Sequence, residues 1–457
     1  MSYCLSIFFI LITISALCIK KSFEIKHSTK TAYLDSFSDE QLKYINNIEN
    51  YKIENCSPEQ IYIFLRHGSR YPNSKYVRNT EDFLNKVKVL RREQAEKYNV
   101  TKTSAIDEIF LTFHDKPHHG LSDLGAFEMY DIGQRFKKRY PNLFSNDEKD
   151  VLNHINIVSS DRDRSIDSGK NFVNGVFGKG SRISEYVNNN FILNNTLIRY
   201  FDECERYLVD VKKKKKSNED LVNFIKGHEM TRLLSNFKTR NHIQELNFET
   251  KILYVIFGLC GIEHAHRMER NWCKLFENDE ELEILSYLSD LKDYWIKSYG
   301  NIINYQVVQY IFKDLFTNLD MHIKNHPKRK KVLLRFGHAE NIIPLVSVLS
   351  LFKDPFVLKY DKFNQVKDRL FKTAIMSPFA SNVAFVLHKC NQTDEMYKVK
   401  ILVNELPLHK IRAGDMECNK ENTSMCNLNS FRSLLNEYLN VDLEQSCTLN
   451  KNLNLEL

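Results

Sequence analysis

Residues 61–72 read Ile-Tyr-Ile-Phe-Leu-Arg-His-Gly-Ser-Arg-Tyr-Pro, and the rest of the chain is interpreted around this segment. Its first five residues are β-branched, aromatic or aliphatic, which predicts a buried strand. Gly68 favours a sharp turn after the strand, and Pro72 ends the segment. In open α/β sheets, ligands bind beyond the carboxyl ends of the strands. The side chains predicted to lie at that position are Arg66, His67 and Arg70.

These three residues suit the binding of an anion. Two guanidinium groups offer forked donors that match a phosphate or a carboxylate. A histidine between them can act as a nucleophile or transfer a proton.

Two later segments repeat the pattern of an apolar run that ends in charged residues. Residues 155–160 predict a second buried strand, and the sequence Asp161-Arg162-Asp163-Arg164 follows it. Residues 332–336 predict a third, followed by Gly337-His338-Ala339-Glu340. Taken alone, the first charged run could be a solvated turn, and His338 could be a hydrogen-bonded core histidine. In both segments, as in the first motif, the charged residues follow the carboxyl end of a predicted strand, which is where ligands bind in open α/β sheets.

The first motif resembles the signature of the histidine acid phosphatases, which hydrolyse phosphomonoesters in two steps and include phytases. The His-Ala-Glu sequence at 338–340 is similar to the multiple inositol polyphosphate phosphatase branch, since most other members have His-Asp there. Residues 197–204 and 272–276 also resemble that branch. The similarity extends from about Cys56 to Cys447.

The resemblance implies a role for each motif residue. His67 would attack phosphorus and become phosphohistidine, while Arg66 and Arg70 would hold the phosphate. His338 would also bind the phosphate, and Glu340 would protonate the leaving oxygen.

The phosphate-binding arginine of the second motif is chosen by alignment. Aligning Ser159, Ser160 and Ser168 with the family selects Arg164, and Arg162 is the alternative. Arg162 could instead pair with Asp161 or Asp163. Asn341 departs from the threonine that usually follows His-Ala-Glu. With four fixed cationic or polar groups around the phosphate, no metal and no cofactor is required.

The proton donor sets an expectation for pH. Glu340 must begin the reaction protonated, which favours acidic conditions unless burial raises its pKa. The sequence therefore predicts an activity optimum below neutral pH.

The expected architecture is an α/β fold with a large, doubly wound mixed sheet flanked by helices. Residues 19–196 and 331–457 would form this core, and residues 197–330 would form an inserted, mainly helical cap that walls the pocket. Apolar residues at helical spacing predict helices over 80–98 and 279–299, and a third begins after Ser122 as N-cap. A helix is also expected from about 167 to 177, and strands over 383–387 and 399–403.

The amino-terminal residues 1–18 predict a signal peptide, because a mostly apolar run of about 15 residues precedes Lys20 and Lys21. An uncleaved anchor is the alternative. The expected location is therefore outside the cell or in the endoplasmic reticulum lumen, with no stable membrane span after cleavage. The sequons at Asn99, Asn194, Asn391 and Asn422 fit this compartment.

Eight cysteines remain after the signal, an even number that predicts four disulfides in an oxidising compartment. Sequence alone leaves their pairing open. The family resemblance implies the pairs Cys56–Cys390, Cys204–Cys447, Cys260–Cys273 and Cys418–Cys426.

The formal net charge of +7 suits an anionic small molecule and does not by itself indicate nucleic acid. Lys212 to Lys216 could attract such a substrate, but a solvated loop is the preferred interpretation. His114, His118 and His119 are interpreted as loop residues, because no acidic or cysteine partner completes a metal site.

The resemblance implies stepwise removal of phosphates from inositol polyphosphates such as phytate, and also 2,3-bisphosphoglycerate 3-phosphatase activity. Two alternatives remain open at this point. One is a secreted acid phosphatase of broad specificity, and the other is a secreted binding protein that sequesters anionic ligands without turnover. The oligomeric state stays unknown.

Overall fold

The computed structural model describes residues 26–99, 103–213, 218–268, 271–391, 396–408 and 425–449. The candidate signal peptide, Asn422, Cys418 and Lys214 to Lys216 lie outside these ranges. None of the described helices combines the length and the apolar character that a bilayer crossing requires.

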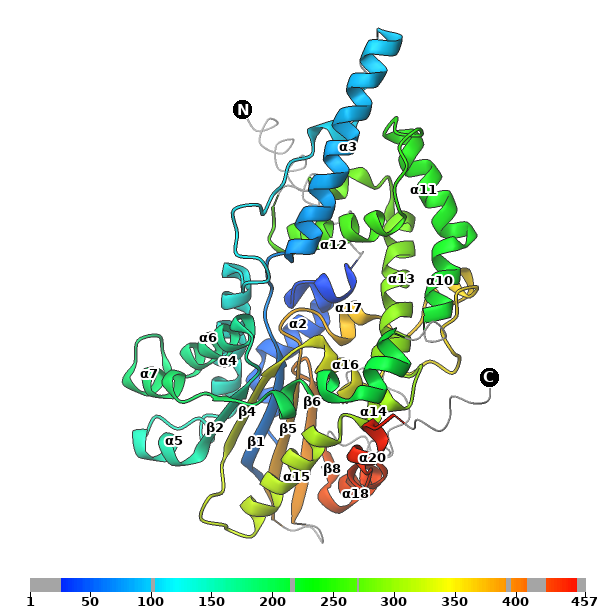
Figure 1. Ribbon diagram of the computed structural model, residues 1–457. Helices are drawn as coiled ribbons and strands as arrows, with labels where there is room; N and C mark the ends of the chain where they lie inside the picture. The colour runs from blue at the N-terminus through cyan, green and yellow to red at the C-terminus, as the bar shows by residue number, and fades with distance from the viewer. Residues whose placement is uncertain are drawn as a thin grey trace, which may run out of the picture.

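A mixed sheet forms the centre of the protein (Figure 1). Its described strands follow the order β3-β2-β4-β1-β5-β6-β7, and β8 pairs with β6. Strands β3, β2, β4 and β1 run parallel, whereas β5 is antiparallel to β1 and β6 is antiparallel to β5. The bounds are β1 Cys56–Arg66, β2 Ile155–Ser159, β3 Ile192–Leu193, β4 Val332–Gly337, β5 Asn382–Cys390, β6 Tyr397–Val403, β7 Leu406–Pro407 and β8 Met425–Asn427.

Alternation along β1 divides the core into two layers. Ile61, Ile63 and Leu65 pack in a cluster that includes Phe136 of helix α4 (Asp123–Arg139) and Phe172 of helix α6 (Asp163–Phe177). Tyr62 and Phe64 point to the opposite face, which helices α15 (Gln309–Ile323) and α18 (Leu428–Leu434) cover. Because successive strand residues face opposite sides, a sheet covered on both faces reads as an uninterrupted apolar run. The expected doubly wound mixed sheet is therefore confirmed.

Helices cover both faces of the sheet and the carboxyl end of its parallel strands (Figure 1). Before β3 the helices are α2 Asp39–Asn46, α3 Ser74–Tyr98, α4 Asp123–Arg139, α5 Glu148–His154, α6 Asp163–Phe177 and α7 Arg182–Asn189. Between β3 and β4 they are α8 Asn195–Ile198, α9 Tyr200–Glu203, α10 Glu219–Lys226, α11 His228–Arg240, α12 Lys251–Ala265, α13 Asp279–Lys297, α14 Ile303–Gln306 and α15 Gln309–Ile323. After β4 they are α16 Ala339–Val348, α17 Thr373–Met376, α18 Leu428–Leu434, α19 Asn436–Leu439 and α20 Leu443–Cys447.

Helices α10 to α13 gather beyond the carboxyl ends of the strands, and α3 packs against α12 (Figure 1). Helix α15 instead lies on the sheet, where Asp314 accepts a hydrogen bond from Tyr62 Oη at 2.9 Å and pairs with Arg335 at 2.8 Å. The helical layer above the strand ends therefore draws on segments both before and after β2.

Most sequence-based helix predictions are confirmed, with shifted ends. Helix α3 begins at Ser74 because Asn73 accepts a hydrogen bond from the backbone N–H of Tyr76 at 2.7 Å and caps it. Ser122 caps α4 as expected, since its Oγ accepts from the N–H of Gly125 at 3.2 Å. Helix α6 begins at Asp163, earlier than the expected residue 167.

Three of the four expected disulfides are present in the described residues: Cys56–Cys390, Cys204–Cys447 and Cys260–Cys273. The first joins the start of β1 to the end of β5, where the two residues are also cross-strand partners. Cys426 is disulfide-bonded, but Cys418, its expected partner, lies outside the described ranges.

Candidate active site

The carboxyl ends of the parallel strands bring the predicted site residues together. His67 follows β1, and its backbone N–H donates to the carbonyl of Gly337 at the end of β4 at 3.0 Å. The N–H of Ser160, after β2, donates to the carbonyl of Phe336 at 3.2 Å. The rings of His67 and His338 consequently meet edge to face, with centroids 5.6 Å apart.

The turn after β1 is held by close backbone packing and a buried carboxylate. A Cβ built on Gly68 would lie 2.4 Å from the carbonyl oxygen of Gly125 in α4, so only glycine fits there. Glu128, also in α4, accepts from the N–H of Ser69 at 2.7 Å and from its hydroxyl at 3.0 Å. Burial raises the pKa of Glu128, against the lowering effect of the backbone donors Tyr33 and Ser69. The turn that carries His67 is therefore fixed from α4.

The contacts of His67 set its tautomer. Its Nδ1 lies 2.9 Å from the carbonyl oxygen of Gly68. A carbonyl can only accept, so Nδ1 carries the proton and Nε2 keeps a free electron pair. Burial, followed by the charge of Arg164, lowers the pKa of His67 well below its ordinary value. His67 is therefore neutral, with Nε2 available as a nucleophile.

The guanidinium groups of Arg66, Arg70 and Arg164 lie within electrostatic reach of His67 and have no carboxylate partner among the described residues. Arg66 is 2% exposed and donates to the backbone carbonyls of Thr29 and Ser377 at 2.9 and 2.7 Å. Arg70 donates to its neighbour's carbonyl, at Tyr71, at 2.8 Å. Within the described ranges, neither of them nor Arg164 lies within ion-pair distance of an acidic group. Unpaired cations that are shielded from water are costly, which indicates a site shaped for an anion.

The pKa values of these arginines are lowered because the groups lie away from water and their positive charges lie close together. Burial, and then the charge of Arg70, lowers the pKa of Arg66 to about 9 and that of Arg164 to about 10. Burial also lowers the pKa of Arg70 itself. A bound phosphate would relieve this repulsion.

Arg164 and Arg162 separate clearly in space. Arg164 lies in the first turn of α6, and its Nη2 is 3.4 Å from Nδ1 of His338. Arg162 precedes the helix, is about half exposed, and pairs with Asp161 at 3.4 Å. The geometry therefore places Arg164 with the two histidines.

His338 is surrounded by donors and caps α16. Its Nε2 lies 3.1 Å from Ser160 Oγ and 3.2 Å from Arg199 Nη1. Asn341, the departure from the family pattern, accepts from the N–H of His338 at 2.9 Å and donates to the carbonyl of Ile198 at 2.7 Å. Burial, and then Arg164, lowers the pKa of His338 well below its ordinary value. The second histidine is therefore also neutral.

Glu340 lies in the first turn of α16, with its side chain 32% exposed, and its Oε1 is 3.3 Å from Nζ of Lys297 in α13. Burial raises the pKa of Glu340, but Lys297 and then His338 outweigh burial and hold it well below its ordinary value. In the absence of substrate, Glu340 is therefore a carboxylate, whereas the proposed acid role requires the protonated form. From the sequence, burial was the one effect on the pKa of Glu340 that could be considered, and burial acts in the opposite direction.

Three cationic residues near the site were missed by sequence reasoning. Arg199 follows β3 and contacts His338, and its only signal was its place in the stretch 197–204. Lys30 and Lys297 gave no signal, because isolated lysines in the sequence have no periodicity. Lys30 lies within electrostatic reach of Arg70, Arg66 and Lys297, and burial followed by these charges lowers its pKa.

The loop that carries the three histidines considered above lies beside the site. The N–H of His119 donates to the carbonyl of Pro72 at 3.0 Å. Burial and then Arg70 lower the pKa of His119 to about 4. Among the described residues, the candidate metal group is a different one, His27 with Cys260 and Cys273, and a disulfide joins its two sulfurs.

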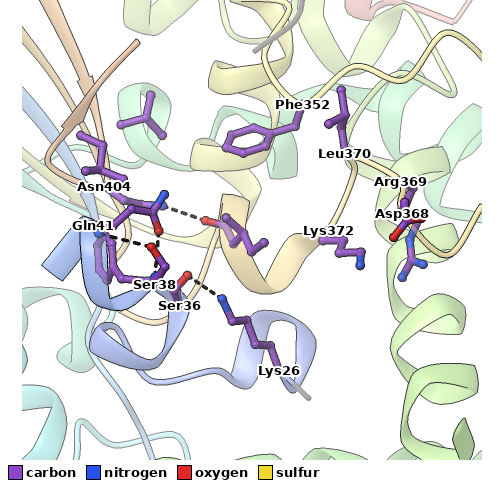
Figure 2. A pocket seen from close by; sticks show the side chains of 14 residues that line it. Lys26, Ser36, Ser38, Gln41, Phe352, Asp368, Arg369, Leu370, Lys372 and Asn404 are labelled. Atoms are coloured by element: carbon purple, nitrogen blue, oxygen red, sulfur yellow. Dashed lines mark hydrogen bonds between the residues drawn. The ribbon is translucent and has the colours of Figure 1, made fainter. Parts of the chain in front are cut away.

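A separate cavity of about 380 Å³ opens between α2, α17 and β6, and Figure 2 shows its lining. Asn404 there donates to the carbonyl of Ile375 at 2.8 Å, and Lys26 donates to that of Ser36 at 2.8 Å. Its arginine, Arg369, is already paired with Asp290 at 2.6 Å. None of the candidate active-site residues lines this cavity.

The chain is similar in sequence to several known proteins. The Histidine phosphatase superfamily (branch 2) profile matches residues 59–404. Multiple inositol polyphosphate phosphatase 1 of Homo sapiens is 28% identical over 375 residues, covering 77% of this chain and 76% of the relative. The thiamine-repressible acid phosphatase pho4 of Schizosaccharomyces pombe is 25% identical over 376 residues, covering 77% of this chain and 76% of that relative.

The fold also matches a solved structure. The Bifidobacterium longum multiple inositol polyphosphate phosphatase in complex with phosphate superposes with a TM-score of 0.72. It is 16% identical in sequence, and the match covers 92% of this chain and 99% of that one.

Proposed function

Because this chain belongs to the histidine phosphatase superfamily, branch 2, we propose that it hydrolyses phosphomonoesters through a phosphohistidine at His67, with inositol polyphosphates as substrates. The observation that carries the proposal is the pairing of a neutral His67, its Nε2 free, with unpaired guanidiniums from two strand ends. The relatives named as inositol polyphosphate phosphatases support the substrate class.

In the first step, Nε2 of His67 bonds to phosphorus as the bond to the leaving oxygen breaks. Arg66, Arg70, Arg164 and His338 would hold the phosphoryl oxygens and stabilise the charge that develops on them. An alkoxide is a poor leaving group, so Glu340 would donate a proton to it.

In the second step, water attacks phosphorus and the nitrogen–phosphorus bond breaks. Glu340, left as a carboxylate by the first step, would accept the proton of the attacking water. His67 is then neutral again and phosphate leaves, which completes the cycle without a net change in the protein.

We further propose that the insertion formed by residues 197–330 caps this site through helices α10 to α13, whereas α15 of the same insertion packs on the sheet. We also propose that the chain is exported after cleavage of residues 1–18. Helices α10 to α13 lie beyond the strand ends, which supports the first proposal (Figure 1). The three disulfides support an oxidising compartment, and Asn99, Asn194 and Asn391 are exposed, as glycan acceptors must be.

The test compares wild type, His67→Ala and the matched control His228→Ala, whose exposed histidine lies on α11. Each protein is incubated with inositol hexakisphosphate at mildly acidic pH, and free phosphate and inositol products are followed. Rapid quenching and mass spectrometry of peptides report phosphohistidine.

We expect phosphate release and phosphohistidine in wild type and in His228→Ala, and neither in His67→Ala. Tight binding of inositol hexakisphosphate without phosphate release by wild type would show a binding protein instead. A higher kcat/KM for p-nitrophenyl phosphate than for inositol hexakisphosphate would favour an acid phosphatase of broad specificity; the Schizosaccharomyces pombe relative is named as an acid phosphatase.

A further inference from the structure

Lys297, at the carboxyl end of α13, bridges two acidic residues. Its Nζ lies 3.0 Å from Oδ1 of Asp293, one helical turn earlier, and 3.3 Å from Oε1 of Glu340. The side chains of Lys297 and Asp293 are 13% and 7% exposed and that of Glu340 is 32% exposed, so water screens the Lys297–Asp293 pair weakly and the Lys297–Glu340 pair more strongly. The proton donor of the proposed reaction is therefore tied to an ammonium group from the helical layer.

Glu340 faces charged groups from several elements. Lys297 and Asp293 come from α13, and His338 precedes Glu340 in the turn before α16. Further titratable groups whose electrostatic reach includes Glu340 are Arg66, Arg70, Arg164, Tyr200 and Tyr207. Lys297 is the one that contacts the carboxylate directly among the described residues.

This arrangement creates a conflict within the proposed mechanism. A general acid must carry a proton, yet an ammonium at 3.3 Å stabilises the carboxylate form of Glu340. The conflict disappears if the ammonium leaves Glu340 when the substrate binds. A phosphate dianion attracts an ammonium more strongly than a single carboxylate does, since it carries twice the charge.

Building on the proposed function, we propose that Lys297 is a positioning residue that couples protonation of Glu340 to a second phosphate group on the substrate. When a phosphate next to the reacting one takes the ammonium, Glu340 takes up one proton from solvent. That proton passes to the leaving oxygen as its bond to phosphorus breaks. A substrate with one phosphate leaves Lys297 on Glu340, so it lacks the proton donor.

The position of Lys297 suits this exchange. Its charge acts on Lys30, which in turn lies within electrostatic reach of Arg66 and Arg70. The bridge therefore borders the cationic cluster instead of lying apart from it. The enzyme would then prefer polyphosphorylated substrates for two reasons: they bind more tightly, and they allow Glu340 to be protonated for transfer to the leaving oxygen.

The test measures kcat and KM from about pH 4 to about pH 8, the range over which a carboxyl donor and histidines titrate. Inositol hexakisphosphate and glycerol 2-phosphate serve as substrates, because both have alkoxide leaving groups. The proteins are wild type, Lys297→Met, Lys297→Arg, Asp293→Asn and the control Lys313→Met, an exposed lysine on α15.

In Lys297→Met, we expect the alkaline limb for glycerol 2-phosphate to move up by about one pH unit, which raises its kcat about tenfold near neutral pH. The preference for inositol hexakisphosphate should fall by about the same factor. Lys297→Arg should restore the wild-type profile. Asp293→Asn should move the limb down, because Lys297 then has Glu340 as its single partner. Lys313→Met should match wild type.

The inference would be overturned if Lys297→Met kept the wild-type pH profile and the wild-type preference for inositol hexakisphosphate. It would also be overturned if Asp293→Asn moved the alkaline limb up, as Lys297→Met is expected to do. If Lys297→Met does not fold, Lys297→Arg and Asp293→Asn still decide the question. If the wild-type protein released phosphate from neither substrate, the proposed function would be refuted instead. Failure of the proposed function is therefore distinguishable from failure of the inference about Lys297.

Discussion

Substituting alanine for Gly125 tests whether backbone packing positions the nucleophile. A Cβ at this position would lie 2.0 Å from the carbonyl oxygen of Ser69 and 2.7 Å from its nitrogen. Ordinary contacts begin near 3.4 Å, so α4 and the turn must separate. The turn contains Gly68 and follows His67 directly, so its displacement moves the imidazole relative to the guanidiniums.

The separation needed is more than about 1 Å, and a misplacement of that size can lower a rate about 100-fold. Overpacking of a rigid contact also costs about 1 to 3 kcal/mol of unfolding free energy. We therefore expect Gly125→Ala to remain folded, with kcat on inositol hexakisphosphate reduced about 100-fold and KM changed less.

The matched control is Gly175→Ala in α6, whose Cβ would lie 2.0 Å from the carbonyl oxygen of Tyr130 in α4. The overlap is equal, but Gly175 lies about 16 Å along the helix from Arg164 at 1.5 Å per residue. Steady-state kinetics and urea unfolding should show similar losses of stability and a much smaller loss of kcat in the control. Equal kcat losses in both variants, or wild-type kcat in Gly125→Ala, would refute the positioning argument.

Three further changes test individual contacts. Arg199→Ala removes a donor that lies 3.2 Å from His338. It should raise KM for inositol hexakisphosphate about tenfold or more, since a charged hydrogen bond contributes about 1.5 to 3 kcal/mol. An unchanged KM would exclude Arg199 from substrate binding. Asn341→Ala should lower the free energy of unfolding by about 1 kcal/mol, as loss of an N-terminal capping contact does, and should also lower kcat. Asn341→Thr should retain the wild-type stability and kcat. Urea unfolding and steady-state kinetics measure the two quantities. Burial lowers the pKa of His388 to about 4, so the unfolded chain binds the extra proton and stability falls as pH falls from about 6.5 towards 4. This group should contribute a loss of about 2 kcal/mol between neutral pH and about pH 5, and urea unfolding of His388→Gln should show a weaker dependence on pH.

The strands that carry the site were predictable because each is a short apolar run followed at once by charged residues. The ends of the elements were less predictable. Strand β1 extends back to Cys56 through the polar residues Ser57, Glu59 and Gln60, because antiparallel pairing with β5 and the disulfide to Cys390 hold it there. Long-range pairing of this kind leaves no local pattern in the sequence.

The motif residues were predictable for the same reason, whereas their environment was not. Glu128 reaches the turn of the first motif from a helix 59 residues away in sequence. Lys297 approaches Glu340 from a segment that the sequence shows only as an amphipathic helix. Whether burial or an ion pair controls the pKa of Glu340 depends on the position of this one ammonium, which is a tertiary feature.

Buried arginines show how structure separates a binding role from a supporting one. Arg135 pairs with Glu405 at 2.6 Å, Arg335 with Asp314 at 2.8 Å, and Arg369 with Asp290 at 2.6 Å. Each of these pairs is satisfied within the protein, so a further anion would have to displace a carboxylate. Arg66, Arg70 and Arg164 lack such partners within the described ranges. In the sequence, a position just after a predicted strand already separates Arg66, Arg70 and Arg164 from the other three arginines. In the structure, the placement of the acidic residues leaves these same three available to an anion from outside.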